Sequence, residues 1–399
     1  MNVLLLSKII PDEVKDEVRA KSKNTMQDAA ISLQQRMIDG FLKNGVNLQI
    51  INKMPIFSYP KFYADAIVRE KRFGEDGENV NLGFINVCYI KQLFKCFSFR
   101  KHIKEYLSKN NVPVLVAYTL DREFLKMIKY AKKINPGVKS CAIVADLPEY
   151  IDLSSNIGFV RKTYSWYTNR SARRLYKYID SYVLLTERMA EKLNINKPFT
   201  VMEGIATDLF GEIGNKEHKK EKTIFYAGTL HRKFGVLNLL DAFDKIKDDS
   251  YRLVICGAGD SEEIIRNQAE KDDRITFYSI LPREQVLKIM QQANVVVNPR
   301  QNNEEFTKYS FPSKNLEALS SGVPFVAYKL DGIPDDYDEH IFYVEGDSPE
   351  DLAKKLMEVC EMPEEERCAK AERARQFVFE NKNAVVQTRK ILDLISKRN

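Results

Sequence analysis

The sequence predicts an α/β protein made of two Rossmann-like domains, each a doubly wound parallel sheet covered by helices. Short apolar runs alternate with amphipathic stretches in both halves of the chain, as in parallel strands joined by crossover helices. At 399 residues the chain is too long for one ordinary core, so two domains are expected. The halves also differ in charge, which suggests different partners.

The first domain is expected at residues 1–203. Strands are predicted at residues 3–6, 46–51, 80–87, 113–118, 140–145, 181–186 and 200–203. Helices are predicted at residues 25–44, 89–108, 122–134 and 161–178. Residues 7–25 are expected to form a loop without glycine at the carboxyl edge of the sheet.

The second domain is expected at residues 223–380, after a linker at residues 204–222 that is rich in Gly, Lys, Glu and Asn. Strands are predicted at residues 223–226, 251–256, 275–278, 294–299 and 324–328. Helices are predicted between them at residues 236–246, 261–270, 283–292 and 313–321. Residues 381–399 complete a helical tail.

Composition narrows the class of protein. Residues 1–205 hold 33 Lys and Arg against 21 Asp and Glu, whereas the rest holds 29 against 35. A basic first half is expected to face a phospholipid surface, a lipid-phosphate acceptor or nucleic acid. The six cysteines and four histidines show no paired spacing, which predicts reduced thiols in a cytoplasmic protein and no metal site. No apolar run is long enough to span a membrane.

The main candidate site is the stretch KYSFPSKNLEALSSGVP at residues 308–324. It lies between two predicted parallel strands and holds one short helix, with Pro312 at its start and Gly322 at its end. The helix N-terminus then falls at the sheet edge where ligands bind, and its free N–H groups predict a phosphate or pyrophosphate site. Glu317, one turn further on, is placed to accept from both hydroxyls of a ribose.

This stretch resembles the E-x(7)-E motif of family-4 retaining glycosyltransferases, which have the GT-B fold and include enzymes of bacterial surface polysaccharides. Glu317 matches the second Glu, which binds the ribose, and Tyr309 stands where the first Glu is usual. The resemblance implies that the donor is bound by Tyr309, Ser310, Pro312, Ser313, Lys314, Asn315 and Glu317. Two alternatives stay open: Glu317 could serve only its own helix dipole, and Tyr309 could simply pack.

The turn after the strand at residues 223–226 is a second part of the candidate donor site, with Gly228 and Thr229 beside the donor. Arg232 and Lys233 are expected to neutralise the leaving diphosphate, although a solvated basic turn is the alternative. The family usually has Arg where Thr229 stands, and here Phe234 separates Lys233 from the following glycine. Leu281 lies in a segment that resembles the family's nucleobase-binding segment. The run Gly257-Ala-Gly is interpreted as a tight turn, not a dinucleotide fingerprint.

Two features of the first domain are candidates for the acceptor side. Asp146 follows a predicted strand and is expected to bind the acceptor or stabilise charge, unless it caps a helix. A basic, aromatic stretch follows, which is typical of a membrane surface, although a core helix with a basic face is the alternative. Its candidate residues for membrane or acceptor are Arg161, Lys162, Trp166, Arg170, Arg173 and Arg174. No recognisable nucleic-acid-binding module is present.

The resemblance implies a GT-B protein whose domains face each other across a cleft and whose last helix returns to the first domain. It implies metal-independent transfer, with retention, from a UDP-sugar in preference to a GDP-sugar, with no cofactor. The departing phosphate would take the acceptor proton. The acceptor would be a saccharide or polyprenyl-linked glycan at the inner face of the cell membrane, in surface-polysaccharide biosynthesis. A sugar-nucleotide epimerase of this fold and a non-catalytic capsule-assembly subunit remain alternatives.

Overall fold

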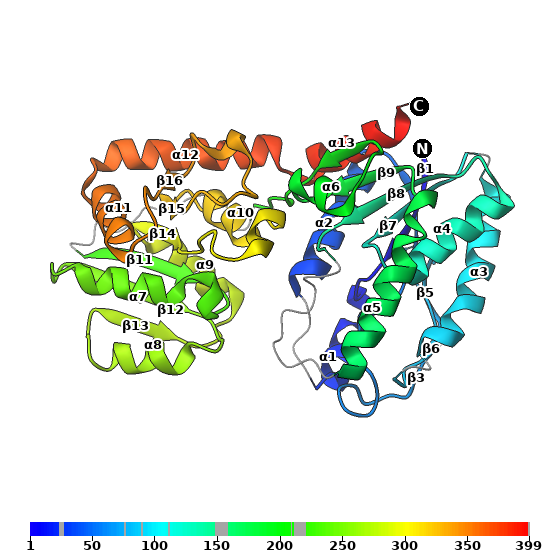
Figure 1. The fold of residues 1–399 in the computed structure, drawn as a ribbon, viewed down its shortest axis with the longest axis horizontal. Coiled ribbons are helices and arrows are strands. Elements are labelled where there is room, and N and C mark those ends of the chain that lie inside the picture. Colours follow the sequence, from blue (N-terminus) through cyan, green and yellow to red (C-terminus); the bar gives the residue numbers. More distant parts are fainter. Residues whose placement is uncertain are drawn as a thin grey trace. The chain divides into compact units, whose positions relative to one another are not determined.

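The computed structural model describes residues 1–23, 28–75, 77–88, 91–110, 112–147, 159–208, 210 and 221–397. The chain divides into two compact units, one of Met1–Met202 with Ala384–Asn399 and one of Glu203–Asn383. Each unit is built on its own, mainly parallel sheet with helices on both faces (Figure 1). Two Rossmann-like α/β units were predicted from the sequence, and the structure confirms them.

The first unit is organised around an eight-stranded sheet in the order β10-β9-β8-β7-β1-β2-β5-β4, parallel except between β4 and β5. Its strands are β1 (Asn2–Ser7), β2 (Asn47–Asn52), β4 (Lys71–Phe73), β5 (Asn79–Asn81), β7 (Val114–Tyr118), β8 (Lys139–Val144), β9 (Ser181–Leu184) and β10 (Phe199–Val201). A separate antiparallel pair joins β3 (Ile67–Val68) to β6 (Phe84–Ile85).

The strand predicted at residues 80–87 is therefore two strands in two different sheets. Gly83 lies between them, and a Cβ there would meet the backbone nitrogen of Glu70 at 2.7 Å. The glycine lets the chain pass this close as it leaves one sheet for the other. The loop predicted at residues 7–25 is also corrected, because it contains the 3-10 turn η1 (Asp12–Val14) and the helix α1 (Lys15–Lys21).

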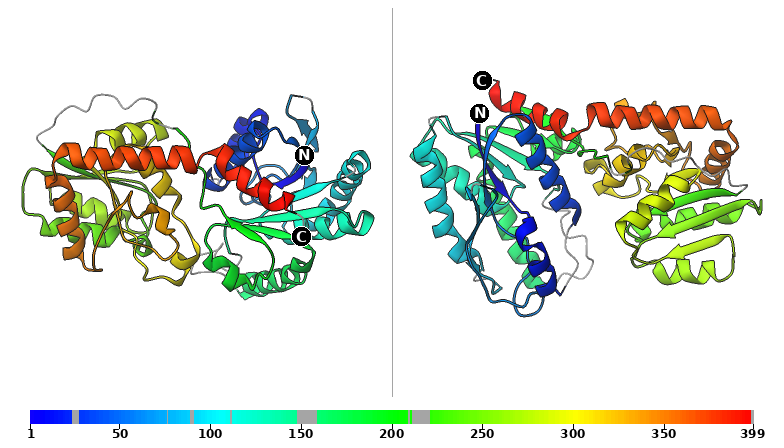
Figure 2. Two further views of the ribbon diagram at one scale, coloured as in Figure 1. Left: turned by 90° about the horizontal axis from the view of Figure 1, so that it is seen from above. Right: turned by 180° about the vertical axis from the view of Figure 1, so that it is seen from behind.

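Helices cover both faces of the first sheet. The helix α2 (Asp28–Lys43) packs with α13 (Ala384–Ser396) on one face, and α3 (Lys91–Lys109), α4 (Arg122–Ile134) and α5 (Phe159–Arg173) lie on the other (Figures 1 and 2). The turn η2 (Tyr176–Tyr178) follows α5, and the short helix α6 (Arg188–Leu193) follows β9. Within the described residues, no helix combines the length and apolar character needed to cross a bilayer.

The last helix, α13, is an integral part of the first unit. It approaches α2 so closely that a Cβ on Gly40 would lie 2.3 Å from the carbonyl oxygen of Ala384. Beside this contact, the Asn44 side-chain amide donates to the carbonyl of Val385 and the hydroxyl of Thr388, at 2.9 and 2.8 Å. Gly40 and Asn44 thus hold α13 against α2, which lies about 340 residues earlier in the chain.

The second unit contains a six-stranded, all-parallel sheet in the order β13-β12-β11-β14-β15-β16. Its strands are β11 (Lys222–Ala227), β12 (Tyr251–Cys256), β13 (Ile275–Tyr278), β14 (Val295–Asn298), β15 (Phe325–Ala327) and β16 (Phe342–Tyr343). The order reverses next to β11, and ligands of open parallel sheets bind at such a switch point, outside the carboxyl ends of the strands.

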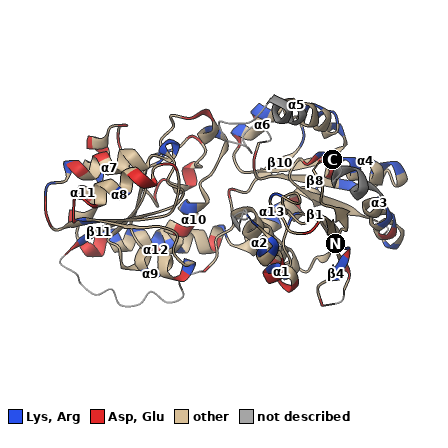
Figure 3. Ribbon diagram, turned by 90° about the horizontal axis from the view of Figure 1, so that it is seen from below, with Lys and Arg blue, Asp and Glu red and all other residues tan. Residues whose placement is uncertain are grey.

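Helices cover both faces of this second sheet. Figure 3 shows α7 (Val236–Lys245), α8 (Glu262–Ala269) and α11 (Pro349–Glu361) on one side of β11. It shows α9 (Arg283–Gln292), α10 (Ser313–Ser320) and α12 (Glu364–Asn381) on the other. The 3-10 turns η3 (Arg232–Phe234), η4 (Glu305–Tyr309) and η5 (Asp335–Tyr337) lie in the connections.

The second unit begins at Glu203 and ends at Asn383, and its two ends contact each other. Lys382 is buried, and its ammonium contacts Glu203 Oε1 at 2.6 Å and Asp336 Oδ2 at 2.8 Å. The N–H of Ala206 also donates to the carbonyl of Lys382 at 2.8 Å. The stretch expected to be a linker therefore begins as part of the second unit, since Ile205 and Ala206 are buried there.

Candidate active site

The N-terminus of α10 lies at the carboxyl edge of the second sheet, as the sequence predicted. Three residues separate the helix from η4, and a hydrogen bond from the Asn298 amide to Asn315 Oδ1, at 2.7 Å, fixes it to β14. Within the described residues, no side chain caps its first turn and no acid lies in that turn. The N–H groups of Ser313 and Lys314 therefore retain the partial positive charge that binds phosphate.

Glu317 lies on the next turn of α10, with its side chain 19% exposed. One carboxylate oxygen contacts Arg283 Nη2 at 2.9 Å, and the other contacts Lys314 Nζ at 2.7 Å. Both cations are about half exposed, so these ion pairs are weak and can exchange for a ligand. Sequence reasoning missed Arg283, which begins α9 and is 34 residues from Glu317.

The turn after β11 packs against the turn after β12 through close backbone contacts. A Cβ on Gly257 would lie 1.9 Å from the carbonyl oxygen of Gly228, and one on Gly259 would lie 2.4 Å from that of Leu230. The interpretation of Gly257-Ala-Gly as a tight turn is therefore confirmed. Thr229 is exposed on the same turn, and its carbonyl accepts a hydrogen bond from the Tyr226 hydroxyl at 3.1 Å.

Arg232 and Lys233 form the 3-10 turn η3 beside this edge. Arg232 is exposed, and its backbone N–H donates to Asp260 Oδ1 at 3.1 Å. The Lys233 ammonium lies over the rings of Phe234 and Phe306, 5.5 and 5.9 Å from their centres. The two cations thus occupy different environments, one in solvent and one against aromatic rings.

A third basic residue at this edge, Arg300, was not identified from the sequence. It follows β14 by two residues and is only 9% exposed. Its Nη2 donates to Ser310 Oγ at 3.0 Å, and its guanidinium lies over the rings of Phe234 and Phe306. The signal in the sequence was a charged residue directly after the apolar run of β14 and Pro299, at the same edge as α10.

Several of the remaining predicted donor residues lie at the start of α10 or just before it. Tyr309 ends η4 and is half-buried, Ser310 accepts from Arg300, and Pro312 is the N-cap residue of α10. Asn315 is completely buried, and its Nδ2 has no hydrogen-bond partner within the described chain. Leu281 packs partly against the core of the unit.

Asp146 lies two residues after β8 in the first unit. The residue is exposed as a whole, yet burial of its carboxyl raises the pKa from 3.8 to about 6. The nearby Tyr118 ends the adjacent strand β7, and its buried hydroxyl lacks a hydrogen-bond partner in the described part of the chain. A carboxyl with this pKa can hold or release a proton near neutral pH. Residues 148–158, where Asp146 was predicted to cap a helix, lie outside the described ones.

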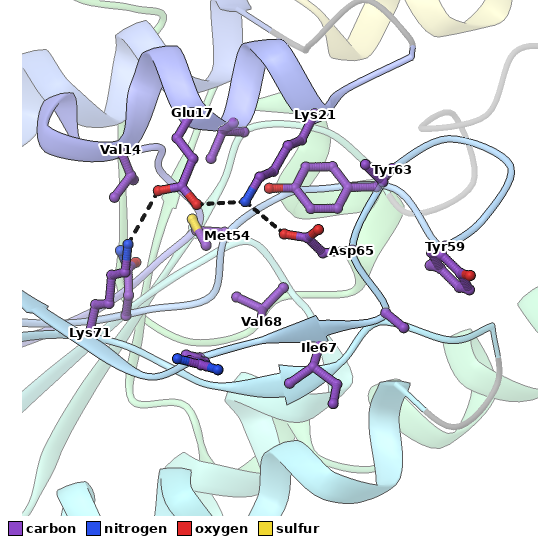
Figure 4. A pocket seen from close by; sticks show the side chains of 15 residues that line it. Val14, Glu17, Lys21, Met54, Tyr59, Tyr63, Asp65, Ile67, Val68 and Lys71 are labelled. Atoms are coloured by element: carbon purple, nitrogen blue, oxygen red, sulfur yellow. Dashed lines mark hydrogen bonds and ion pairs between the residues drawn. The ribbon is translucent and has the colours of Figure 1, made fainter.

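A cavity of about 670 Å³ opens near the carboxyl ends of β2 and β5 (Figure 4). Its apolar lining includes Val14, Val18, Met54 and Val68. Its polar lining holds an ion-pair network in which Glu17 contacts Lys21 and Lys71, and Lys21 contacts Asp65 at 2.8 Å. Tyr59 and Tyr63 add aromatic surface, and Ile67 is 66% exposed.

The predicted basic helix is α5, followed by η2. Trp166 and Tyr167 are 64% and 56% exposed, and Arg170, Arg173 and Arg174 are exposed as well. The guanidinium of Arg170 lies 5.6 Å from the centre of the Trp166 ring. This face of α5 is therefore not packed into the core of its unit. The side chains of Arg161 and Lys162 lie outside the described ones.

Residues 212–377 match the family described as Glycosyl transferases group 1. This match lies within the second unit. No curated protein matches the chain in sequence. Within the described residues, no group of His, Cys, Asp and Glu has the arrangement of a metal site.

Several solved structures resemble this chain over nearly its whole length. Sucrose-phosphate synthase from Thermosynechococcus elongatus is 14% identical, with a TM-score of 0.63 over 99% of this chain and 98% of that one. Anabaena HepE in complex with UDP is 14% identical, with a TM-score of 0.64 over 99% and 100%. The lipopolysaccharide outer core galactosyltransferase WaaB is 13% identical, with a TM-score of 0.63 over 99% of each chain. These similarities confirm the GT-B fold.

Proposed function

We propose that this protein is a retaining glycosyltransferase that uses a UDP-sugar donor. The observation that carries the proposal is the uncapped N-terminus of α10, followed one turn later by Glu317, within a glycosyltransferase group 1 domain. The diphosphate binds the N–H groups of Ser313 and Lys314, and Glu317 accepts from the ribose hydroxyls. HepE, which has a similar fold, was solved with UDP bound.

In the free protein, the ion pairs of Glu317 hold its carboxylate at the site. When a nucleotide binds, Lys314 and Arg283 turn toward the phosphates, and Glu317 turns its free oxygens toward the ribose. This exchange costs little, because both cations are about half exposed. Positioning of the donor and stabilisation of its departing diphosphate by these cations, with Arg232 and Lys233, then drive the transfer without a metal.

The experiment is a thermal-shift screen with UDP, 2′-deoxy-UDP, GDP, ADP and UDP-sugars. UDP is expected to raise the Tm most among the diphosphates, and 2′-deoxy-UDP is expected to bind less well than UDP. Glu317→Ala should weaken UDP binding about 10- to 100-fold and remove the preference over 2′-deoxy-UDP, because hydrogen bonds to a charged group contribute about 1.5–3 kcal/mol. Glu263→Ala, at an exposed position of α8, is the matched control. Equal UDP affinity in Glu317→Ala would reject the ribose role.

For the acceptor, we propose that the first unit binds a saccharide or polyprenyl-linked glycan in the cavity of Figure 4. The aromatic rings of the lining can stack on the apolar face of a sugar, and its ion-paired carboxylates can accept hydrogen bonds from sugar hydroxyls. The volume of about 670 Å³ lies in the range of ligand sites. Asp146, at the same edge of the sheet, contacts the acceptor or stabilises charge near it. We place the reaction in cell-surface polysaccharide biosynthesis at the cytoplasmic face of the membrane.

A substitution at the rim of the cavity separates acceptor binding from donor binding. Ile67→Asp puts a charge on an exposed apolar lining residue and should raise the KM for the acceptor without changing UDP affinity. Val112→Asp is the control, because Val112 is also 66% exposed in the first unit but does not line the cavity. If both variants transfer sugar with the same acceptor KM, the cavity is not the acceptor site.

A further inference from the structure

Arg300 is a buried cation for which the described residues provide no carboxylate. The residue is only 9% exposed. Its Nη2 donates a hydrogen bond to the Ser310 hydroxyl at 3.0 Å. The buried Nε has no partner in the described chain. Burial lowers the pKa of Arg300 to about 10, so the guanidinium is still charged at neutral pH. A buried charge without a carboxylate partner destabilises the folded protein, so a functional reason for Arg300 at this position is expected.

The position of Arg300 connects the two halves of the donor site. Ser310, its hydrogen-bond partner, lies three residues before α10. Pro299, which precedes Arg300, packs closely against the turn after β11. A Cβ on Gly235 in that turn would lie only 2.0 Å from the carbonyl oxygen of Pro299. The rings of Phe234 and Phe306 flank the guanidinium, with their centres 5.2 and 4.6 Å from Cζ. Aromatic packing thus holds this cation at the start of α10.

The turn after β11 holds two cations, Arg232 and Lys233. Thr229 and Phe234, in the same turn, carry no charge and cannot neutralise a phosphate. Of the two cations that the turn does have, Arg232 extends into solvent and Lys233 lies over aromatic rings. The ring of Phe234, in the same turn, packs against the guanidinium of Arg300.

We infer that Arg300 binds the diphosphate of the nucleotide donor, in addition to the cations of the turn after β11. The planar guanidinium has donors left for two phosphate oxygens, a geometry that lysine cannot reproduce. Ser310 and the flanking rings orient the fork before the ligand arrives, so little freedom is lost on binding. This inference rests on the proposed function and assigns a diphosphate-binding residue to that same site.

Calorimetry with UDP on the full chain tests the inference with three variants. Arg300→Met is expected to weaken UDP binding about 10- to 100-fold, as for the loss of charge-assisted hydrogen bonds. Arg300→Lys should restore part of the affinity, because it keeps the charge but not the fork. Arg367→Met is the matched control, because Arg367 is also 9% exposed in the second unit and contacts the amino end of β14 through the Asn294 carbonyl.

The Tm without ligand separates a binding role from a structural one. Arg300→Met should keep or raise the Tm, because it removes a buried charge without a carboxylate. The inference is overturned if Arg300→Met binds UDP within twofold of the wild type, or if UDP affinity falls only in proportion to Tm in all three variants. A wild type that binds no nucleoside diphosphate would instead reject the proposed function itself.

Discussion

At the scale of single residues, the site combines groups that the sequence reveals with groups that only the fold brings together. Glu317 and Lys314 are recognisable because they lie in one short motif with a helix start and a small-residue stop. Arg283 reaches Glu317 from the beginning of another helix, and Arg300 reaches Ser310 across a loop. Contacts between residues far apart in the sequence cannot be predicted from spacing. The motif therefore predicts part of the anion site but not the guanidinium groups of Arg283 and Arg300.

Asp146 gives a pH-dependent prediction at this scale. Its pKa is raised from 3.8 to about 6 by burial, so between these values the folded protein binds more protons than the unfolded chain. Asp146 therefore lowers the stability progressively as the pH rises from about 4 to 6, and the loss stays constant above that. Asp146→Asn should be more stable than the wild type at pH 7.5, with the difference shrinking toward pH 4.

Urea unfolding at several pH values measures this difference in the free energy of unfolding. Asp208→Asn, at an exposed position, is the control for the loss of a carboxylate. A pH-independent difference between Asp146→Asn and the wild type would show that the carboxyl is not desolvated in the folded protein. In the transfer reaction, the same variant should lose activity, because a substitution that stabilises the protein at a functional site commonly reduces its activity.

At the scale of elements, periodicity predicted most helices and strands to within a few residues, and glycines decided the exceptions. The predicted strand at residues 80–87 fails because Gly83 lets the chain change sheets. The helix α1 was missed because its seven residues are too few to show a clear apolar stripe. In contrast, the series from β11 to β15 was predicted element by element, because its apolar runs are separated by recognisable helix starts and stops.

The packing of α13 on α2 depends on the missing side chain of Gly40. Gly40→Ala places a Cβ 2.3 Å from the Ala384 carbonyl oxygen, so one helix must move. The free energy of unfolding should fall by about 1–3 kcal/mol, the usual cost of overpacking, as measured by urea denaturation. Gly137→Ala is the control, because its nearest atom is a side-chain oxygen at 3.2 Å. An equally stable Gly40→Ala variant would mean that α13 is loosely attached.

The exposed face of α5 predicts attachment to anionic membranes. We expect the full chain to bind vesicles that contain anionic lipid better than neutral vesicles, with a strong dependence on salt. Reversing Arg170, Arg173 and Arg174 to Glu should weaken this binding at least about tenfold, since each basic residue near the surface contributes about 1 kcal/mol. Reversal of Lys247, Lys271 and Lys288, which are exposed in the second unit, changes the net charge equally. Equal losses in both triple variants would leave only a net-charge effect.

At the scale of the whole molecule, the alternation of strands and helices in both halves predicted two Rossmann-like units, whereas the predicted catalytic class rests on the second half of the chain. The family match covers residues 212–377, which contain the α10 motif and the turn after β11. The first half shares the architecture, but its cavity and the face of α5 are built from loops and side chains without a recognisable pattern. The acceptor is therefore less predictable than the donor, because loops carry specificity on a common scaffold.

The central claim is that the N-terminus of α10 binds the phosphates of a nucleotide. Hydrogen–deuterium exchange, with and without saturating UDP, tests it directly on the backbone amides of Ser313 and Lys314. We predict that UDP slows exchange in residues 310–320 more than in any other helix of the second unit. If UDP binds while exchange at these amides stays unchanged, the phosphates bind elsewhere and the account is wrong.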